Sequence, residues 1–188
     1  SIDTGRTSQG VSQEGMDKRG MKTVRLIDAC FPQTSSSIAG DNSERHPSNF
    51  EWCRTDPCDS LNTFYTNWTL KDALTDNKPS RVAWLLEPPS LWTWPYEFVA
   101  KNRKAFMSIL TYDKRLLGSG DSRFKFCPHG GSWVGWDSWN IYPKTKDVCM
   151  IMSDKNITVG QTLRHEIHDE MGNMIDFYGT GVDRPFDR

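Results

Sequence analysis

Short apolar runs alternate with polar loops and helical stretches along the chain from residue 21 onward. This pattern predicts an α/β domain with a mainly parallel sheet, because parallel strands are buried on both faces and appear as continuous apolar runs. The runs that predict strands are residues 24–29, 82–86, 105–110, 124–127, 148–152 and 174–178. We expect a Rossmann-like fold in which these strands share one sheet flanked by helices.

The clearest helix lies between the last two predicted strands. Thr158 followed by Gln161 is typical of a capping box at its start, and Gly172 is a fitting stop. Apolar side chains recur at intervals of four, at Val159, Leu163, Ile167 and Met171. The order strand, helix, strand predicts a right-handed parallel crossover. A shorter helix is predicted over residues 95–102, with Pro95 in its first turn.

Two segments show no such periodicity. Residues 1–20 contain only Ile2, Val11 and Met16 as apolar side chains, which predicts a flexible tail or leader. Residues 32–50 are rich in Ser, Asn and Gly and predict a long connecting loop. The remaining chain, residues 21–188, is predicted to form a single α/β domain.

Composition excludes several classes of protein. The 188 residues carry 23 basic and 24 acidic side chains, for a net charge of -1, which argues against a general nucleic-acid binder. The mean hydropathy is -0.64, and no apolar run approaches the roughly 20 residues that cross a bilayer, so no membrane span is expected. Eight tryptophans indicate a use for broad aromatic surfaces.

The five cysteines predict neither a disulfide framework nor a zinc ribbon. Their number is odd and no CxxC pair occurs, although Cys53 and Cys58 have only four residues between them. Unpaired thiols are the expected state, which favours a reducing compartment and a cytoplasmic location.

Glu87 is the leading candidate for chemistry. In an open parallel sheet, ligands bind beyond the carboxyl ends of the strands, and Glu87 directly follows the apolar run 82–86 on a proline-stiffened turn. A rigidly held, partly desolvated carboxylate suits acid-base catalysis. The large aromatic side chains that follow are Trp92, Trp94 and Tyr96. Aromatic faces beside a carboxylate suit sugars; alternatively, Glu87 caps the next turn or pairs with an arginine.

A second candidate segment follows residues 124–127. His129 is a potential donor or base, and the two following glycines would let the backbone approach a ligand closely. The candidate binding residues are His129, Gly130, Gly131 and Trp133. A tight turn is the alternative. No GxGxxG or GxxxxGK[ST] motif occurs, so dinucleotide and nucleoside-triphosphate roles are not indicated.

The sequence His165-Glu166-Ile167-His168 invites a zinc interpretation. Its histidines are three residues apart, whereas the HExxH motif places them four apart. A solvated helix face is therefore the favoured interpretation and no metal is expected. A metallohydrolase remains an alternative that metal analysis would decide.

Four stretches of the chain resemble the α-1,3-fucosyltransferase-like glycosyltransferases of family 10, particularly their phage and bacterial members. They are VAWLLEPP (82–89), FCPHGGSW (126–133), CMIMSDKNITVGQTLRHEI (149–167) and IDFYGTGVDRP (175–185). The resemblance implies an inverting transferase of two Rossmann-like domains, the GT-B arrangement, of which this chain is similar to the amino-terminal, acceptor-side half.

The resemblance also assigns roles to individual residues. Glu87 matches the glutamate that deprotonates the acceptor hydroxyl, Ser153 ends the matching strand, and Arg164 lies on the matching helix. The implied donor is a nucleotide sugar, GDP-fucose in the family, held mainly by a carboxyl-terminal half that is the expected missing partner. No other cofactor is implied. The alternative is a carbohydrate-binding or structural domain without turnover.

Overall fold

The computed structural model describes residues 22–29, 37–38, 44–45, 47–54, 57–58, 60–128, 138–180 and 182. The tail expected over residues 1–20 lies outside this range. The chain divides into two compact units, one of Ser1–Pro89 with Thr93–Asp137 and one of Ser90–Trp92 with Ser138–Arg188. Each unit is described by itself, and the single domain expected over residues 21–188 remains a prediction.

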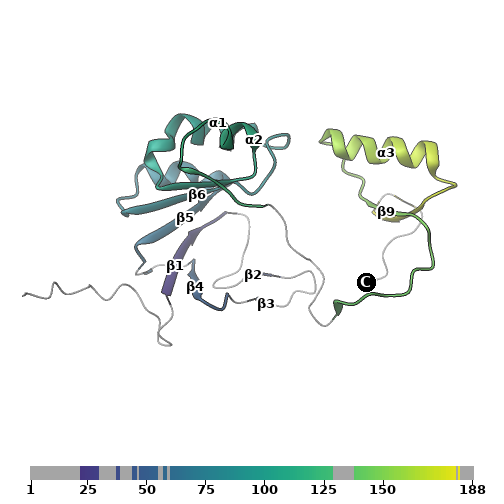
Figure 1. The fold of residues 1–188 in the computed structure, drawn as a ribbon, viewed down its shortest axis with the longest axis horizontal. Helices are drawn as coiled ribbons and strands as arrows, with labels where there is room; N and C mark the ends of the chain where they lie inside the picture. The colour runs from purple at the N-terminus through teal and green to yellow at the C-terminus, as the bar shows by residue number, and fades with distance from the viewer. Residues whose placement is uncertain are drawn as a thin grey trace, which may run out of the picture. The chain divides into compact units, whose positions relative to one another are not determined.

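The first unit contains a six-stranded sheet in the order β4-β1-β5-β6-β7-β8, in which every pairing is parallel (Figure 1). Its strands are β1 (Lys22–Ile27), β4 (Phe50–Cys53), β5 (Asn62–Thr66), β6 (Ser80–Trp84), β7 (Ser108–Thr111) and β8 (Phe124–Phe126). The predicted α/β class and the mainly parallel, Rossmann-like sheet are confirmed. The predicted runs 24–29, 82–86, 105–110 and 124–127 correspond to β1, β6, β7 and β8, respectively.

Two strands of this sheet, β4 and β5, are not continuous apolar runs and were not predicted from the sequence. In β5, Thr63 and Thr66 are fully buried although they are polar, so hydropathy does not distinguish this strand from a loop. In β4, all four side chains are only half-buried. The predicted loop 32–50 also contains a short antiparallel pair, β2 (Ser37–Ile38) and β3 (Glu44–Arg45), so its description as a plain loop is wrong.

Helices of the first unit pack on one face of the sheet and enclose the core. They are η1 (Asn67–Leu74), α1 (Thr93–Asn102), η2 (Arg103–Ala105) and α2 (Lys114–Leu117). Tyr65 of β5, Ile109 of β7 and Val99 of α1 have no exposed surface and meet in this core. Figure 1 shows α1 and α2 lying over this face.

The opposite face of the sheet carries an aromatic cluster. Trp52 of β4 lies 5.5 Å from Phe64 of β5 and 6.3 Å from Trp84 of β6, measured between ring centroids. Because successive side chains of a strand point to opposite faces, Phe64 turns away from the helices while its neighbour Tyr65 turns toward them. Aromatic side chains therefore join three strands of the sheet on this face.

The second unit is a strand-helix-strand motif. Strands β9 (Cys149–Met152) and β10 (Asp176–Gly179) pair in parallel, and α3 (Val159–Met171) connects them. The predicted helix and its capping box at Thr158 and Gln161 are confirmed. The expectation that these strands share the large sheet is wrong: among the described residues they form a separate two-stranded sheet. Apolar runs reveal strands but do not specify which backbones exchange hydrogen bonds.

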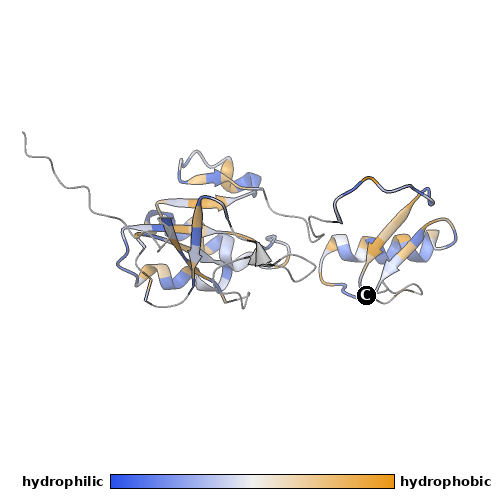
Figure 2. Cartoon of the chain, turned by 90° about the horizontal axis from the view of Figure 1, so that it is seen from below, coloured by the Kyte–Doolittle hydropathy of each residue, from blue (hydrophilic) through white to orange (hydrophobic). Residues whose placement is uncertain are grey.

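The apolar stripe of α3 does not form its packing face. Val159 is 84% exposed and Leu163 is 51% exposed, whereas His168 packs edge-on against Phe177 of β10 with ring centroids 4.8 Å apart. Figure 2 shows α3 with alternating hydrophilic and hydrophobic segments beside its strands. Among the described helices of both units, none is long and apolar enough to cross a membrane.

The cysteine prediction is wrong for one pair. Cys53, the last residue of β4, and Cys58 form a disulfide, with their Cα atoms 6.1 Å apart. Cys127 and Cys149 are free. Folding of the edge strand and the following turn brings together two cysteines whose spacing fits no common motif. The argument from unpaired thiols to a reducing compartment therefore loses its basis.

Two glycine substitutions test the second unit. Gly179 has φ +129°, and a Cβ there would overlap the carbonyl oxygen of Met152, so Gly179→Ala should destabilise the unit by more than about 2 kcal/mol. Gly160 lies in α3 with open space around it, so Gly160→Ala should stabilise it by about 0.5–1 kcal/mol. Chemical denaturation of both variants measures the effects, and equal effects of the same sign would contradict this structure.

Candidate functional site

Parallel pairing places the carboxyl ends of all six strands of the first unit on one side of the sheet, called here the carboxyl edge. The order β4-β1-β5-β6-β7-β8 reverses direction between β1 and β5, since the chain moves outward from β1 to β4 and then returns to β5 on the other side. In doubly wound sheets such a reversal is where ligands bind, beyond the strand ends. The residues that follow β1 and β5 lie at the reversal itself, and those that follow β6 and β7 continue along the same carboxyl edge.

Asn67 fixes the segment that follows β6. It is the first residue after β5, is 3% exposed and has φ +32°, a left-handed conformation that a residue with a side chain seldom adopts. The backbone N–H of Leu86 donates a hydrogen bond to its Oδ1 atom at 3.3 Å. Sequence inspection missed Asn67, although asparagine is among the residues that best tolerate this conformation.

Tyr96 fixes the next peptide of the same segment. Its hydroxyl donates a hydrogen bond to the backbone carbonyl of Glu87 at 2.6 Å, while its ring is 4% exposed. Burial raises the pKa of the phenol, and a hydrogen bond with Tyr112 and the charges of Asp113 and Glu87 raise it further. Tyr96 therefore stays protonated and remains a donor at any physiological pH. The predicted binding residue Tyr96 is thus a core residue that holds the Glu87 backbone.

The carboxylate of Glu87 is half-buried at this edge and makes no hydrogen bond or ion pair with any residue the structure describes. The turn ahead of α1 is closed instead by Thr93, whose hydroxyl donates to the carbonyl of Pro89 at 3.1 Å. The alternative roles for Glu87, as a cap or as the partner of an arginine, therefore find no support among the described residues. Its backbone carbonyl is held by Tyr96, and its carboxylate has no partner among the described residues.

Two aromatic residues belong to the helices that hold this segment: Trp68 directly follows Asn67 in η1, and Trp94 lies in α1 with Tyr96. Trp68, two residues past the end of β5, stacks on Trp94 of α1 with ring centroids 5.9 Å apart and planes 15° apart. Trp94 also packs against Phe98 at 5.2 Å. Trp68 is 47% exposed and Trp94 is 36% exposed. Trp94 was predicted from the sequence, but Trp68 was not, because it follows a strand that the apolar pattern did not reveal.

The other predicted binding residues are more dispersed. Trp92, which belongs to the second unit although it precedes α1 in the sequence, is half-buried. In the second unit, the Ser153 hydroxyl accepts a hydrogen bond from the N–H of Lys155 at 3.4 Å, and Arg164 is exposed on α3. His129, Gly130, Gly131 and Trp133 lie outside the described residues. The expected meeting of Glu87, Gly130 and Ser153 at one edge remains a prediction.

The two histidines of α3 contact different residues. The His165 Nε2 atom lies 3.1 Å from the carbonyl oxygen of Lys155, while the His168 Nδ1 atom lies 3.3 Å from a carboxylate oxygen of Asp169. Within the described ranges, no three His, Cys, Asp or Glu side chains are grouped closely enough to hold a metal ion. The arrangement fits the interpretation of a partly solvated helix face.

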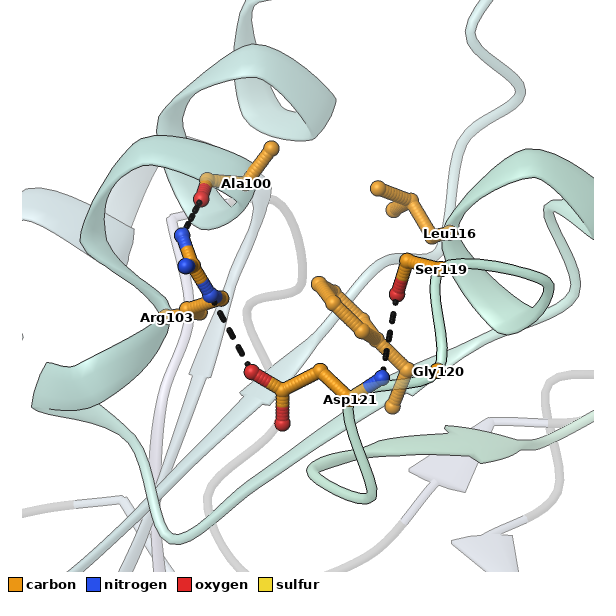
Figure 3. A pocket seen from close by; sticks show the side chains of 7 residues that line it. Ala100, Arg103, Leu116, Ser119, Gly120 and Asp121 are labelled. Carbon is orange, nitrogen blue, oxygen red and sulfur yellow. Dashed lines mark hydrogen bonds and ion pairs between the residues drawn. The ribbon is translucent and has the colours of Figure 1, made fainter.

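A pocket of about 430 Å³ lies at the opposite edge of the first unit (Figure 3). It is lined by Ala100, Arg103, Leu116, Ser119, Gly120, Asp121 and Phe124. Asp121 precedes β8 and Arg103 precedes β7, so parallel pairing places this pocket at the amino ends of the strands. It is therefore separate from the carboxyl edge.

Tyr96→Phe tests the contact that holds Glu87. The variant keeps the buried ring but removes the hydrogen bonds of the hydroxyl to the Glu87 carbonyl and with Tyr112, so we expect a loss of about 1–3 kcal/mol in the free energy of unfolding. Hydrogen exchange at the amide of Leu86 should accelerate more than exchange in the distant strand β8. Equal acceleration at both places would show that the hydroxyl has no local role.

Asp113, which follows β7, should contribute a pH-dependent part of stability. Hydrogen bonding from the Arg115 side chain holds the pKa of Asp113 below its usual value of 3.8, despite the opposing effect of burial. A lowered folded-state pKa gives stability that is fully present above the unfolded value and is lost as pH falls through the folded value.

Asp113 also caps α2 by accepting hydrogen bonds from two backbone N–H groups. Asp113→Asn preserves a good cap and should flatten the acid end of the pH-stability curve, whereas Asp113→Ala should cost about 0.5–2 kcal/mol near neutral pH. Urea unfolding across the acid range measures both. An unchanged pH dependence in Asp113→Asn would contradict the assignment.

Comparison with known proteins adds no assignment to this geometry. No protein-family model, no curated protein and no solved structure matches the chain. What this protein does is therefore inferred from its residues and from the geometry of the carboxyl edge.

Proposed function

We propose that this chain is the acceptor-side half of an inverting glycosyltransferase, with a carbohydrate acceptor bound at the carboxyl edge of the first unit. The observation that carries the proposal is Glu87: its backbone is held by Tyr96 at 2.6 Å, and its carboxylate is unengaged by described residues. A general base needs a fixed position and an open lone pair toward the substrate proton. The resemblance to the family 10 fucosyltransferase-like enzymes supports the same residue.

The proposed reaction is a single displacement. Glu87 accepts the proton of an acceptor hydroxyl as that oxygen forms a bond to the anomeric carbon of the donor sugar. The bond from the anomeric carbon to the nucleotide diphosphate breaks in the same step, and the diphosphate leaves with the electron pair. The configuration at the anomeric carbon is thereby inverted. Contacts to the diphosphate are proposed to come from a carboxyl-terminal domain of the GT-B type.

The aromatic rings supply the acceptor platform in this proposal. We assign the main stacking surface to Trp68, because it is the more exposed of the two stacked tryptophans, at 47% against 36% for Trp94. The apolar C–H face of a sugar ring stacks on such a surface while its hydroxyls remain free for hydrogen bonds.

The binding test uses the chain as it is. We expect oligosaccharides from an immobilised panel to bind the 188-residue chain, and Trp68→Ala to weaken that binding roughly three- to tenfold. Trp94→Ala should weaken binding and lower thermal stability more than Trp68→Ala does, because Trp94 packs against both Trp68 and Phe98. Val159→Ala on α3 is the control. Calorimetric titration with GDP-linked and UDP-linked sugars should show no affinity, and micromolar binding would overturn the half-enzyme assignment.

The catalytic test requires a protein that carries both halves. There, Glu87→Gln should keep fold, donor binding and acceptor binding but lower turnover by about a hundredfold or more. A loss of turnover with unchanged acceptor binding would show that Glu87 acts as the general base and that the aromatic surface binds the acceptor without it. Glycan binding with unaffected turnover in Glu87→Gln would remove Glu87 from the mechanism. Glycan binding without any transfer by the complete protein would instead favour a carbohydrate-binding domain.

A further inference from the structure

The pocket at the amino ends of β7 and β8 has a charged wall that the proposed transfer reaction does not use. Figure 3 shows Arg103 and Asp121, which both line it, pointing toward each other and joined as an ion pair. The Arg103 Nε atom lies 3.1 Å from a carboxylate oxygen of Asp121, and Arg123 Nη1 lies 2.9 Å from the same oxygen. Two guanidinium groups thus share one carboxylate, which leaves a local excess of positive charge.

Several hydrogen-bond donors around the pocket have no acceptor among the described residues. The Arg103 Nη1 atom donates to the carbonyl of Ala100 at 3.0 Å, but its second terminal nitrogen has no partner among the described residues. Ser119 Oγ accepts from the N–H of Asp121 at 3.4 Å, which leaves its hydroxyl proton to donate elsewhere. The N–H of Gly120 makes no hydrogen bond in the described part of the chain.

The charge around the pocket, its apolar wall and its volume limit the chemical class of ligand that it could bind. Residues 100–104 and 119–123 contain four basic side chains and one acidic side chain, although the whole chain has a net charge of -1. The remaining pocket wall is apolar, with Phe124 8% exposed and Ala100 and Leu116 half-buried. A pocket of about 430 Å³ is within the range that holds small-molecule ligands.

We propose that this pocket binds a small oxyanion, a phosphate monoester or a carboxylate, attached to an apolar body. The guanidinium of Arg103, the Ser119 hydroxyl and the Gly120 N–H would donate to the oxyanion, since charge-assisted hydrogen bonds to arginine are the strongest of this kind. The apolar body would lie against Ala100, Leu116 and Phe124. Because the pocket is at the opposite end of the strands from Glu87, this site is independent of the proposed transfer reaction.

The experiment titrates the 188-residue chain with phenyl phosphate, benzoate and phenol, followed by calorimetry and by the amide NMR signal of Gly120. We expect saturable millimolar or tighter binding of at least one of the two anions, weaker binding of phenol, and weakening with added salt. Arg103→Gln should reduce anion affinity about tenfold or more. Ala100→Phe fills the apolar part and should abolish binding of the aromatic anion while leaving the guanidinium groups in place.

Lys114→Gln is the matched control, because it removes one exposed positive charge from α2, outside the pocket lining. It should leave both affinities unchanged. Circular dichroism and the thermal midpoint establish that each variant is folded; if Arg103→Gln fails to fold, Ala100→Phe and Ser119→Ala still decide the question. No saturable binding of either anion up to about 10 mM, or an equal loss in Lys114→Gln and Arg103→Gln, would overturn the proposal.

Discussion

Hydrogen bonds between parallel strands determine where the functional groups of the first unit can lie. With six strands running in one direction, every strand end of one kind falls on the same edge, and the crossover segments η1, α1 and α2 carry the chain back over one face. Residues far apart in sequence, such as Asn67, Glu87 and Asp113, therefore reach a common edge without any direct sequence signal. Because Asp121 precedes β8, the same parallel pairing places the pocket beside it at the amino ends of the strands.

The segment after β6 illustrates how a core can hold a reactive group. Leu85 is 2% exposed and its N–H donates to the carbonyl of Leu110 at 3.0 Å, so the sheet ladder continues one residue past the strand. Asn67 then holds Leu86, and Tyr96 holds Glu87. Each of these hydrogen bonds contributes about 1 kcal/mol net, yet leaving a buried partner unsatisfied costs more, so the backbone of three consecutive residues is held together.

The parts of this structure that sequence reasoning found are those with local signals. Thr158 and Gln161 define a helix start within four residues, and the apolar run before Glu87 marks a strand end. Asn67, Trp68 and the Cys53–Cys58 disulfide depend instead on β4 and β5, whose half-buried or polar side chains give no apolar pattern. Periodicity located α3 but did not specify its contacts, because an apolar stripe indicates a surface that can be buried without specifying what lies against it.

The backbone crowding at Gly179 has a consequence for the ancestry of the protein. Its Cα faces the carbonyl of Met152 on the neighbouring strand so closely that no side chain fits while β9 and β10 keep their register. A chain descended from the same ancestor that keeps this register is therefore expected to carry glycine at this position. Where a side chain occupies that position, the two strands must be spaced or offset differently, and common descent would have to be argued from other positions.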